Sequence, residues 1–282
     1  MPAEHGNPAV HWSSSSRTDV GMVRQHNEDA CLDRPEAGLW AVADGMGGHS
    51  AGDVASAMIV QRLQALDPAQ PLSRLVEQAE AILEAVNAEL LQLASTREAA
   101  TIGSTVVALI AHGAHAVCLW AGDSRVYRLR DGVLEQVTQD HALVADLVDR
   151  GVLSAEQAAN HPQSNLVTRA VGAADTLKLD LEIMRLRPGD RFILCSDGLD
   201  KELRHDEIRE VLARGGGAGA ADALVELALS RGSRDNVTVV AVQIDGEAPD
   251  AAAGEVELFD ADSEDTLPGF TVGRRAGTPR IK

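Results

Sequence analysis

The sequence predicts an α+β fold in which an antiparallel β-sandwich is flanked on both sides by helices, giving four αββα layers. Two observations favour this class. Short apolar runs outnumber those that a regular alternation of strand and helix would give, and long amphipathic segments lie between groups of them. No internal repeat is visible in the 282 residues, which disfavours a solenoid or a propeller. We therefore expect one large two-sheet domain.

The first half of the chain predicts strands followed by a pair of helices. Residues 12–21 and 38–44 are extended in character, and the second stretch runs LWAVAD into a glycine-rich turn. Apolar residues recur at helical spacing over 51–66 and 72–93, with charged residues between them. This pattern predicts two amphipathic helices that pack together on one sheet.

Runs of Val, Leu and Ile from 105 to 137 predict an antiparallel meander. HGAH, GDSR and RDG break the runs, and Asp131-Gly132 is a strong signal for a hairpin turn. The polar, helix-prone stretch 140–162 interrupts the strand pattern, and we interpret it as a mobile flap. The remaining predicted elements are strands at 179–186, 191–196 and 236–244 and helices at 205–214 and 220–231.

The composition changes after Asp245. Residues 246–282 are rich in Ala, Gly, Pro and acidic side chains, so they cannot bury enough apolar surface to fold alone. We therefore divide the chain into a catalytic domain at 1–245 and a disordered acidic tail. Thr266 follows acidic residues in SEDTLPG, which suits a kinase site read by a forkhead-associated partner, although a solubilising tail is the simpler interpretation.

The net charge and the cysteine content limit the classes of partner and the cellular compartment that we expect. The formal charge of −18 disfavours nucleic acid and anionic membranes as partners. No leader-like stretch or apolar run of about 20 residues is visible, so we expect a cytoplasmic protein, with a monomer as the default. The three cysteines, Cys31, Cys118 and Cys195, are far apart in apolar stretches and are predicted to be buried thiols.

Five short acidic motifs follow predicted strands. They are NED at 27–29, DGMGGH at 44–49, GDSR at 122–125, SDG at 196–198 and DN at 235–236. Each one alone is a common turn signal. Five of them at strand ends predict a carboxylate cluster, in which two like charges 4 Å apart repel by about 4 kcal/mol at an effective dielectric near 20.

Such a cluster needs cations in order to stay ionised. Oxygen ligands without thiolates select hard ions, so Mn²⁺ or Mg²⁺ is favoured over zinc or copper. Two such ions about 4 Å apart can hold a bridging water and lower its pKa for attack on a phosphoester. The sequence therefore predicts a two-ion hydrolase site, with room for a third ion.

An arginine should bind the phosphate in such a site. Arg24 is the leading candidate because it lies four residues before Glu28, and a guanidinium matches two phosphate oxygens at once. Arg125 and Arg17 are weaker candidates. For Arg125 an ion pair with Asp123 or a strand neighbour is the preferred interpretation, and for Arg17 a solvated charge at a strand edge.

The motifs, in their order, resemble the metal-dependent Ser/Thr protein phosphatases of the 2C type, the PPM family, and especially its compact bacterial members. The resemblance covers roughly residues 12–244. It is carried by RTDVGMVRQHNEDA, VADGMGGHSAGDVAS, IGSTVV, WAGDSRVYRL, TRAVG, ILCSDGL and SRDNVTVV. It implies a protein serine/threonine phosphatase with the metals in a cleft at one edge of the two sheets.

The resemblance also implies roles for individual residues. Asp44 would bridge two core ions, Gly45 would bind one through its carbonyl, and Glu28 would act on that ion directly or through water. Asp197 and Asp235 would complete the ligands of the second ion, and Asp123 would hold a third ion together with Asp197. Arg24 matches the phosphate-binding arginine. Supporting roles fall to Asp29 and Asn236.

One position departs from the animal pattern, DGHAG. Met46 replaces the histidine proposed there as general acid, and His49 is the possible substitute. His49 could equally cap the helix that begins near residue 51. His112 and His115 in the HGAH hairpin are interpreted as turn or surface residues.

Several other functions compete with this hypothesis. A cysteine phosphatase needs a C-x5-R loop, and the spacing from Cys118 to Arg125 is one residue too long. A two-metal nuclease should be basic. A phosphatase of a phosphorylated anti-sigma antagonist and a non-catalytic phosphoprotein-binding regulator stay open as alternatives. The expected partners are phosphoproteins, the targets of a Ser/Thr kinase.

Overall fold

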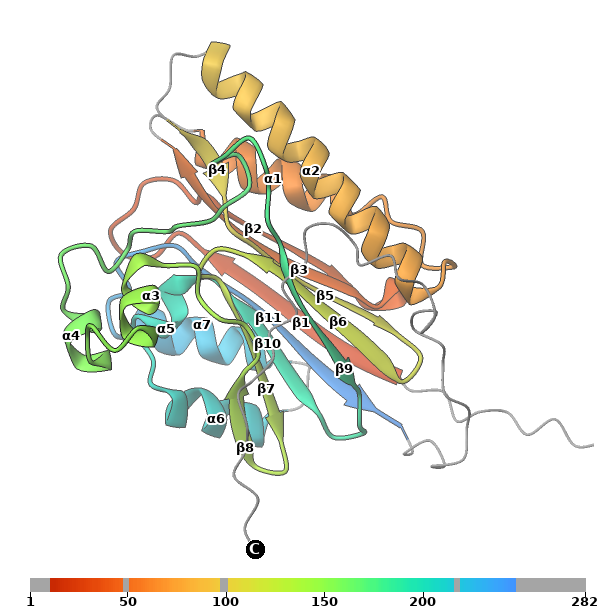
Figure 1. The fold of residues 1–282 in the computed structure, drawn as a ribbon. Coiled ribbons are helices and arrows are strands. Elements are labelled where there is room, and N and C mark those ends of the chain that lie inside the picture. Colours follow the sequence, from red (N-terminus) through yellow and green to blue (C-terminus); the bar gives the residue numbers. More distant parts are fainter. Residues whose placement is uncertain (1–10, 48–50, 97–100, 216–218, 247–282) are drawn as a thin grey trace, which may run out of the picture.

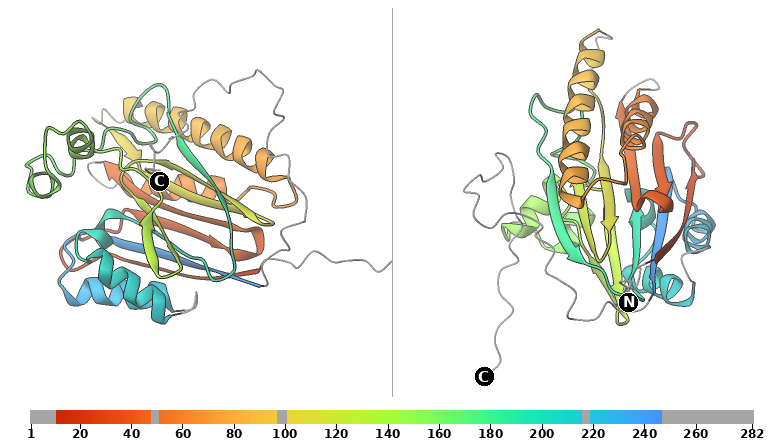
Figure 2. Two further views of the ribbon diagram at one scale, coloured as in Figure 1. Left: turned by 60° about the horizontal axis from the view of Figure 1, so that its bottom comes forward. Right: turned by 90° about the vertical axis from the view of Figure 1, so that its right-hand side faces the viewer.

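A computed structural model describes residues 11–47, 51–96, 101–215 and 219–246 of the protein. It shows two antiparallel sheets packed face to face, with helices on the outer side of each (Figure 1). Figure 2 shows the same layers from two further sides. The four-layer αββα architecture is confirmed.

The five-stranded sheet brings the first and last described strands together. Its order is β1 (His11–Asp19), β11 (Val237–Asp245), β10 (Arg191–Cys195), β7 (Arg125–Arg130) and β8 (Val133–Gln136). β1 and β11 pair along their whole length, from His11 opposite Asp245 to Asp19 opposite Val237. The DN motif directly precedes β11, so it lies at the end of the sheet where β1 leads into the loop that carries NED.

The six-stranded sheet contains the remaining strands. Its order is β2 (Asp29–Arg34), β3 (Leu39–Gly47), β5 (Val106–His112), β6 (His115–Ala121) and β9 (Asp180–Arg185), and β4 (Ile102–Ser104) pairs with the end of β3. A short 3₁₀ turn, η1 (Pro35–Ala37), joins β2 to β3. In the β2–β3 register Asp29 stands opposite Asp44.

Helices cover the outer face of each sheet. The six-stranded sheet carries α1 (Gly52–Leu63) and α2 (Leu72–Thr96), and the five-stranded sheet carries α6 (His205–Arg214) and α7 (Ala220–Ser230). The short helix α5 (Asp197–Asp200) follows β10 directly. The stretch predicted as a flap holds α3 (Leu143–Asp149) and α4 (Ala155–Ala159), which lie at one end of the sandwich (Figure 1).

Three apolar layers hold the fold together. Trp40 and Phe192 are fully buried between the sheets, Ile59 lies in the layer under α1 and α2, and Leu224 lies in the layer under α6 and α7. Burying a side chain of this size contributes about 1.5–3 kcal/mol. The four layers are thus held together by three contiguous cores, which fix the ends of the strands where the acidic motifs stand.

The prediction of one meander over 105–137 was wrong. β5 and β6 form a hairpin in the six-stranded sheet, whereas β7 and β8 form a hairpin in the other sheet. The chain crosses between the sheets at 122–124, within GDSR. Asp131 and Gly132 form the predicted turn between β7 and β8, and both have positive φ angles, 52° and 78°, as a type I′ turn requires.

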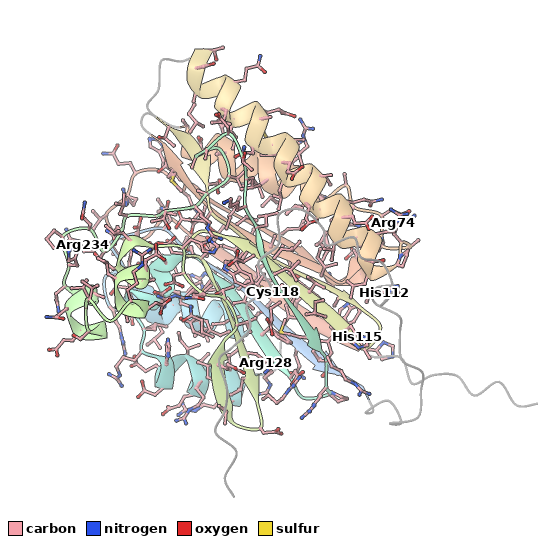
Figure 3. The ribbon with its side chains drawn as sticks, in the orientation of Figure 1. Arg74, His112, His115, Cys118, Arg128 and Arg234 are labelled. Carbon is pink, nitrogen blue, oxygen red and sulfur yellow. The ribbon has the colours of Figure 1, made fainter. Side chains whose placement is uncertain are left out.

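The histidines of the HGAH hairpin are turn residues, as predicted. His112 pairs with His115 at the tip of the β5–β6 hairpin. Figure 3 shows both at the opposite side of the molecule from Arg234, which is next to Asp235 in the chain. They therefore lie far from the end of the sandwich that carries the acidic motifs.

The cysteines are thiols without disulfide partners. Cys118 and Cys195 are buried, and burial raises the pKa of each well above its usual value. Burial also raises the pKa of the half-buried Cys31, to about 11. None of the three is a thiolate nucleophile at neutral pH. Across the described part of the chain, no helix is both long enough and apolar enough to span a bilayer.

Candidate metal centre

Asp44 lies at the centre of a group of aspartates at one end of the sandwich. Burial raises the pKa of Asp44 well above its usual value, and the charges of four other aspartates raise it further. These four, in decreasing order of effect, are Asp29, Asp197, Asp123 and Asp235. These electrostatic interactions place one aspartate from each of the five acidic motifs near the others.

The backbone of Asp44 is fixed by its neighbours in the sheet. Its N–H donates to Thr105 Oγ1 (3.0 Å), and its carbonyl accepts from the N–H of Thr105 (2.9 Å) and from Ser104 Oγ (3.0 Å). These bonds fix the main chain of Asp44, so its carboxylate stays near the like-charged side chains of the neighbouring motifs. The repulsion is therefore built into the fold.

Asp29 is the most buried of the described carboxylates around Asp44, with 8% of the residue exposed. Its Oδ2 accepts hydrogen bonds from Ser196 Oγ and Thr238 Oγ1, both at 2.7 Å. Burial nevertheless raises its pKa to about 7, and Asp197 and Asp235 contribute to the rise. Asp29 thus links the two sheets, because its own strand is in one sheet, while Ser196 directly follows β10 and Thr238 lies in β11 of the other.

Asp123 stands in the crossing between the sheets. Burial raises its pKa to about 7, with further contributions from Asp197 and Asp140. It is therefore close to Asp197, with which it was predicted to hold a third ion. The sequence did not single out Asp140, which precedes α3 and adds negative charge on this side.

Two glycines in the acidic motifs allow the loops to pack closely. A Cβ at Gly45 would lie 2.0 Å from the carbonyl oxygen of Gly52 and 2.6 Å from that of Glu28. A Cβ at Gly198 would lie 2.0 Å from the carbonyl oxygen of Asn236. The glycine of each Asp-Gly pair is thus required for close approach between motifs, a constraint that the turn signal alone does not reveal.

Asn236 connects three segments of the centre. Its Oδ1 accepts from the N–H of Glu28 (2.8 Å), and its Nδ2 donates to the carbonyls of Val20 and His26, both at 3.0 Å. These bonds hold the loop that carries Arg24 and Glu28 against the start of β11. Burial raises the pKa of Glu28, and the nearby Asp53 and Asp235 also raise it.

Asp235 is held by two cations. Arg24 Nε donates to Asp235 Oδ1 (2.8 Å), and Lys201 Nζ lies 3.4 Å from Asp235 Oδ2. Burial raises the pKa of Asp235, but the hydrogen bond from Arg24 and the charges of Lys201 and Arg24 outweigh burial and keep that pKa below its usual value. Lys201 also contacts Asp197 Oδ2, at 2.5 Å.

The aspartates are neighbours, but they do not form a finished ligand set. Within the described ranges, no three His, Cys, Asp or Glu side chains converge closely enough to hold a metal ion as they stand. Asp197 and Asp235 are instead bridged by the ammonium group of Lys201. The sequence analysis missed Lys201, although its spacing of four residues from Asp197 in a short helix is an ion-pair signal.

The two other arginine candidates pair with carboxylates outside the predicted ligand set. Arg125 Nη2 lies 2.6 Å from Asp140 Oδ2, and Arg125 Nη1 lies 2.9 Å from Asp200 Oδ2. Its ion pairs are thus with these residues and not with the predicted partner Asp123. Arg17 pairs with Asp222 and Glu226 on the outer surface of α7, so it is not simply solvated. Both arginines have structural partners that account for them.

The donor atoms of the centre fit a hard divalent cation. The candidate ligands are carboxylates and one backbone carbonyl, which are the oxygen donors that Mn²⁺ and Mg²⁺ accept. Burial and the surrounding carboxylates raise the pKa of Asp44, so its own anion is destabilised unless further positive charge lies nearby. His49, the possible general acid, lies outside the described residues.

Comparison with known proteins gives consistent matches. The family model described as Protein phosphatase 2C matches residues 21–227. The serine/threonine protein phosphatase PstP of Mycobacterium tuberculosis is 37% identical over 273 residues, which cover 95% of this chain and 52% of PstP. The chain thus spans about half the length of that relative.

Solved structures match the fold as well. PppA of Pseudomonas aeruginosa, described as a key regulatory component of the T6SS, has a TM-score of 0.79 and 46% identity, covering 84% of this chain and all of PppA. The catalytic domain of PstP, solved in complex with two manganese ions, has a TM-score of 0.76 and 36% identity, covering 84% of this chain and 99% of that domain.

Proposed function

Because the chain belongs to the protein phosphatase 2C family, we propose that it hydrolyses phosphoserine and phosphothreonine in proteins with Mn²⁺ or Mg²⁺. The observation that carries the proposal is the position of Asp44. Four other aspartates raise its pKa, and all of them come from strand ends or loops at one end of the sandwich. A stable fold that accumulates this much like charge in one place needs a cationic ligand there.

We assign the predicted residues to two core ions and a third, weaker one. Asp44, Gly45 and Glu28 would hold the first ion, with Asp44 bridging to the second. Asp197 and Asp235 would complete the ligands of the second ion, and Asp123 would hold the third ion together with Asp197. When bound, the ions would neutralise the carboxylates and activate water for attack on phosphorus.

The chain's own residues would bind and orient the phosphate. Arg24 forms its ion pair with Asp235 through Nε, and 55% of its side chain is exposed. The edge of the guanidinium that carries Nη1 and Nη2 therefore remains for two phosphate oxygens. Asn236 fixes the loop that carries Arg24, so the phosphate-binding group is held in a defined place beside the carboxylates.

Hydrolysis of phosphopeptides tests the proposal directly. We expect the purified chain to release phosphate from phosphothreonine and phosphoserine peptides in Mn²⁺, to lose this activity in EDTA and to keep it after treatment with iodoacetamide. Activity that survives EDTA but not the alkylating reagent would contradict a metal-dependent mechanism. A chain that binds the peptide without turnover would favour the non-catalytic regulator.

Replacing Arg24 tests the phosphate-binding role. Arg24→Met removes a charge-assisted contact worth about 1.5–3 kcal/mol, so kcat/KM for a phosphopeptide should fall roughly 10- to 100-fold at saturating Mn²⁺. Arg17→Met is the matched control, because Arg17 pairs with α7 and should leave kcat/KM unchanged. Equal activity of the two variants would remove Arg24 from the site.

The proposal extends to the substrates of the chain and to its cellular location. The substrates would be phosphoproteins made by a Ser/Thr kinase in the cytoplasm, and the chain would act as a monomer. Phosphorylated anti-sigma antagonists are a narrower class of the same substrates, and a panel of phosphoproteins would separate them. Thr266 and the rest of the proposed tail, from residue 247 onward, lie outside the described residues. A forkhead-associated partner for Thr266 stays a prediction, testable by deleting residues after Asp245.

A further inference from the structure

Lys201 occupies a position between two candidate metal ligands. Its Nζ lies 2.5 Å from Asp197 Oδ2 and 3.4 Å from Asp235 Oδ2. The chain contains three lysines, Lys178, Lys201 and Lys282. One of them therefore stands in the group of aspartates that the proposed function assigns to the second core ion.

The local structure fixes Lys201 in this place. Asp197 begins α5 and Lys201 caps its end, so the two side chains lie on one face of a single helical turn. About a third of the Lys201 side chain is exposed. Asp235 reaches the same ammonium from the loop before β11, with Arg24 on its other oxygen. The ammonium is thus bound by carboxylates from two separate segments.

An ammonium and a divalent cation that approach the same carboxylate oxygens compete for them and repel each other. Oδ2 of Asp197 and Oδ2 of Asp235 face Lys201, and each is an oxygen that a metal ion would need. Binding of the ion requires the lysine side chain to swing away, and its positive charge then stays within the same small region. Both effects oppose metal binding.

We propose that Lys201 is a built-in counter-ion that stabilises the metal-free protein and that Mn²⁺ must displace from Asp197 and Asp235. The proposal rests on the proposed function only in assigning these two aspartates to a metal ion. It makes Lys201 a positioning residue that sets the affinity of this side of the centre. It also predicts that the metal-free chain is a stable, folded state and that the metal is bound reversibly.

Calorimetric titration of Mn²⁺ into the chelator-treated full chain tests the proposal without any assay of hydrolysis. At pH 8, we expect Lys201→Met to lower the Kd for Mn²⁺ by about tenfold or more, since an opposite charge at contact distance shifts a carboxylate equilibrium by 1–3 decades. Lys178→Met makes the same change on an exposed residue before β9, and its Kd should equal that of the wild type.

Thermal unfolding in EDTA gives a second readout. Lys201→Met should lower the melting temperature of the metal-free chain, and adding Mn²⁺ should raise it by more than in the wild type. If Lys201→Met fails to fold without metal, Lys201→Gln takes its place in the titration, because its amide can still donate to one carboxylate.

The outcomes separate this proposal from the proposed function. An unchanged or weaker Mn²⁺ affinity in Lys201→Met and Lys201→Gln, with normal binding in the wild type, overturns the role of Lys201 alone. A wild-type chain that binds no Mn²⁺ overturns the metal centre itself. Tighter binding in both variants, with Lys178→Met unchanged, supports the proposal.

Discussion

Asp44→Asn is expected to reduce phosphopeptide hydrolysis roughly a thousandfold while leaving the chain folded. The substitution removes the carboxylate that four other aspartates surround, and it is the proposed bridge between the two core ions. The main-chain hydrogen bonds to Thr105 do not involve the side chain and should persist. Because one of several repelling charges is lost, the melting temperature in EDTA should be equal to that of the wild type or higher.

Asp131→Asn is the matched control for this variant. Asp131 is an exposed hairpin residue with a φ of 52°, a conformation that asparagine tolerates, so its activity and stability should match the wild type. Phosphate release and the melting temperature in EDTA are the two measurements. Near-normal activity in Asp44→Asn would remove the site that we propose. A large loss of stability would instead give Asp44 a structural role.

The metal-free chain is expected to lose stability as the pH rises from about 4 to about 7. Burial raises the pKa of Asp29 from 3.8 to about 7, so in this range the folded chain holds a proton that the unfolded chain has released. The free energy of unfolding therefore falls with rising pH. A shift of about three pKa units corresponds to about 4 kcal/mol, most of it lost by neutral pH.

Urea unfolding in EDTA at several pH values measures this effect. Asp29→Asn cannot titrate at this position, so its free energy of unfolding should fall less steeply with pH than that of the wild type. Asp44 and Asp123, whose pKa values burial also raises, account for the slope that remains. Asp33→Asn makes the same change on the same strand, where the aspartate accepts a hydrogen bond from Ser14, and should keep the wild-type slope. If the wild type and Asp29→Asn have equal slopes between pH 4 and 7, Asp29 does not carry the buried proton.

The sequence predicted the layers of the fold better than its pairings. Apolar periodicity located both helix pairs, and Asp131-Gly132 located the β7–β8 turn because its φ angles demand such residues. The meander was wrong because runs of Val, Leu and Ile look the same in either sheet of a sandwich. β2 (Asp29–Arg34) escaped prediction because it is short and its charged residues obscure the alternation.

The candidate site was predicted from motifs, and its details came from three-dimensional contacts. Five acidic turns implied a common location, and the coupling of Asp44 to four aspartates agrees with that idea. The linear sequence does not show that Arg125 pairs with Asp140 and Asp200. Asp140 lies 15 residues further along the chain, in the segment before α3, and Asp200 lies in α5. The acidic motifs alone do not indicate Lys201, because the contact between its ammonium group and Asp235 joins two segments that are distant in the chain.

The connection that crosses from β6 in one sheet to β7 in the other is short. Residues 122–124 are all that separate Ala121 in one sheet from Arg125 in the other. Four residue steps reach at most about 14 Å, and packed sheets stand about 10 Å apart. If one sheet moved relative to the other, the connection at 122–124 would be stretched before longer connections. Asp123 lies within this connection, so a change in the distance between the sheets would move the side chain that we propose for the third ion before it moved the other candidate ligands.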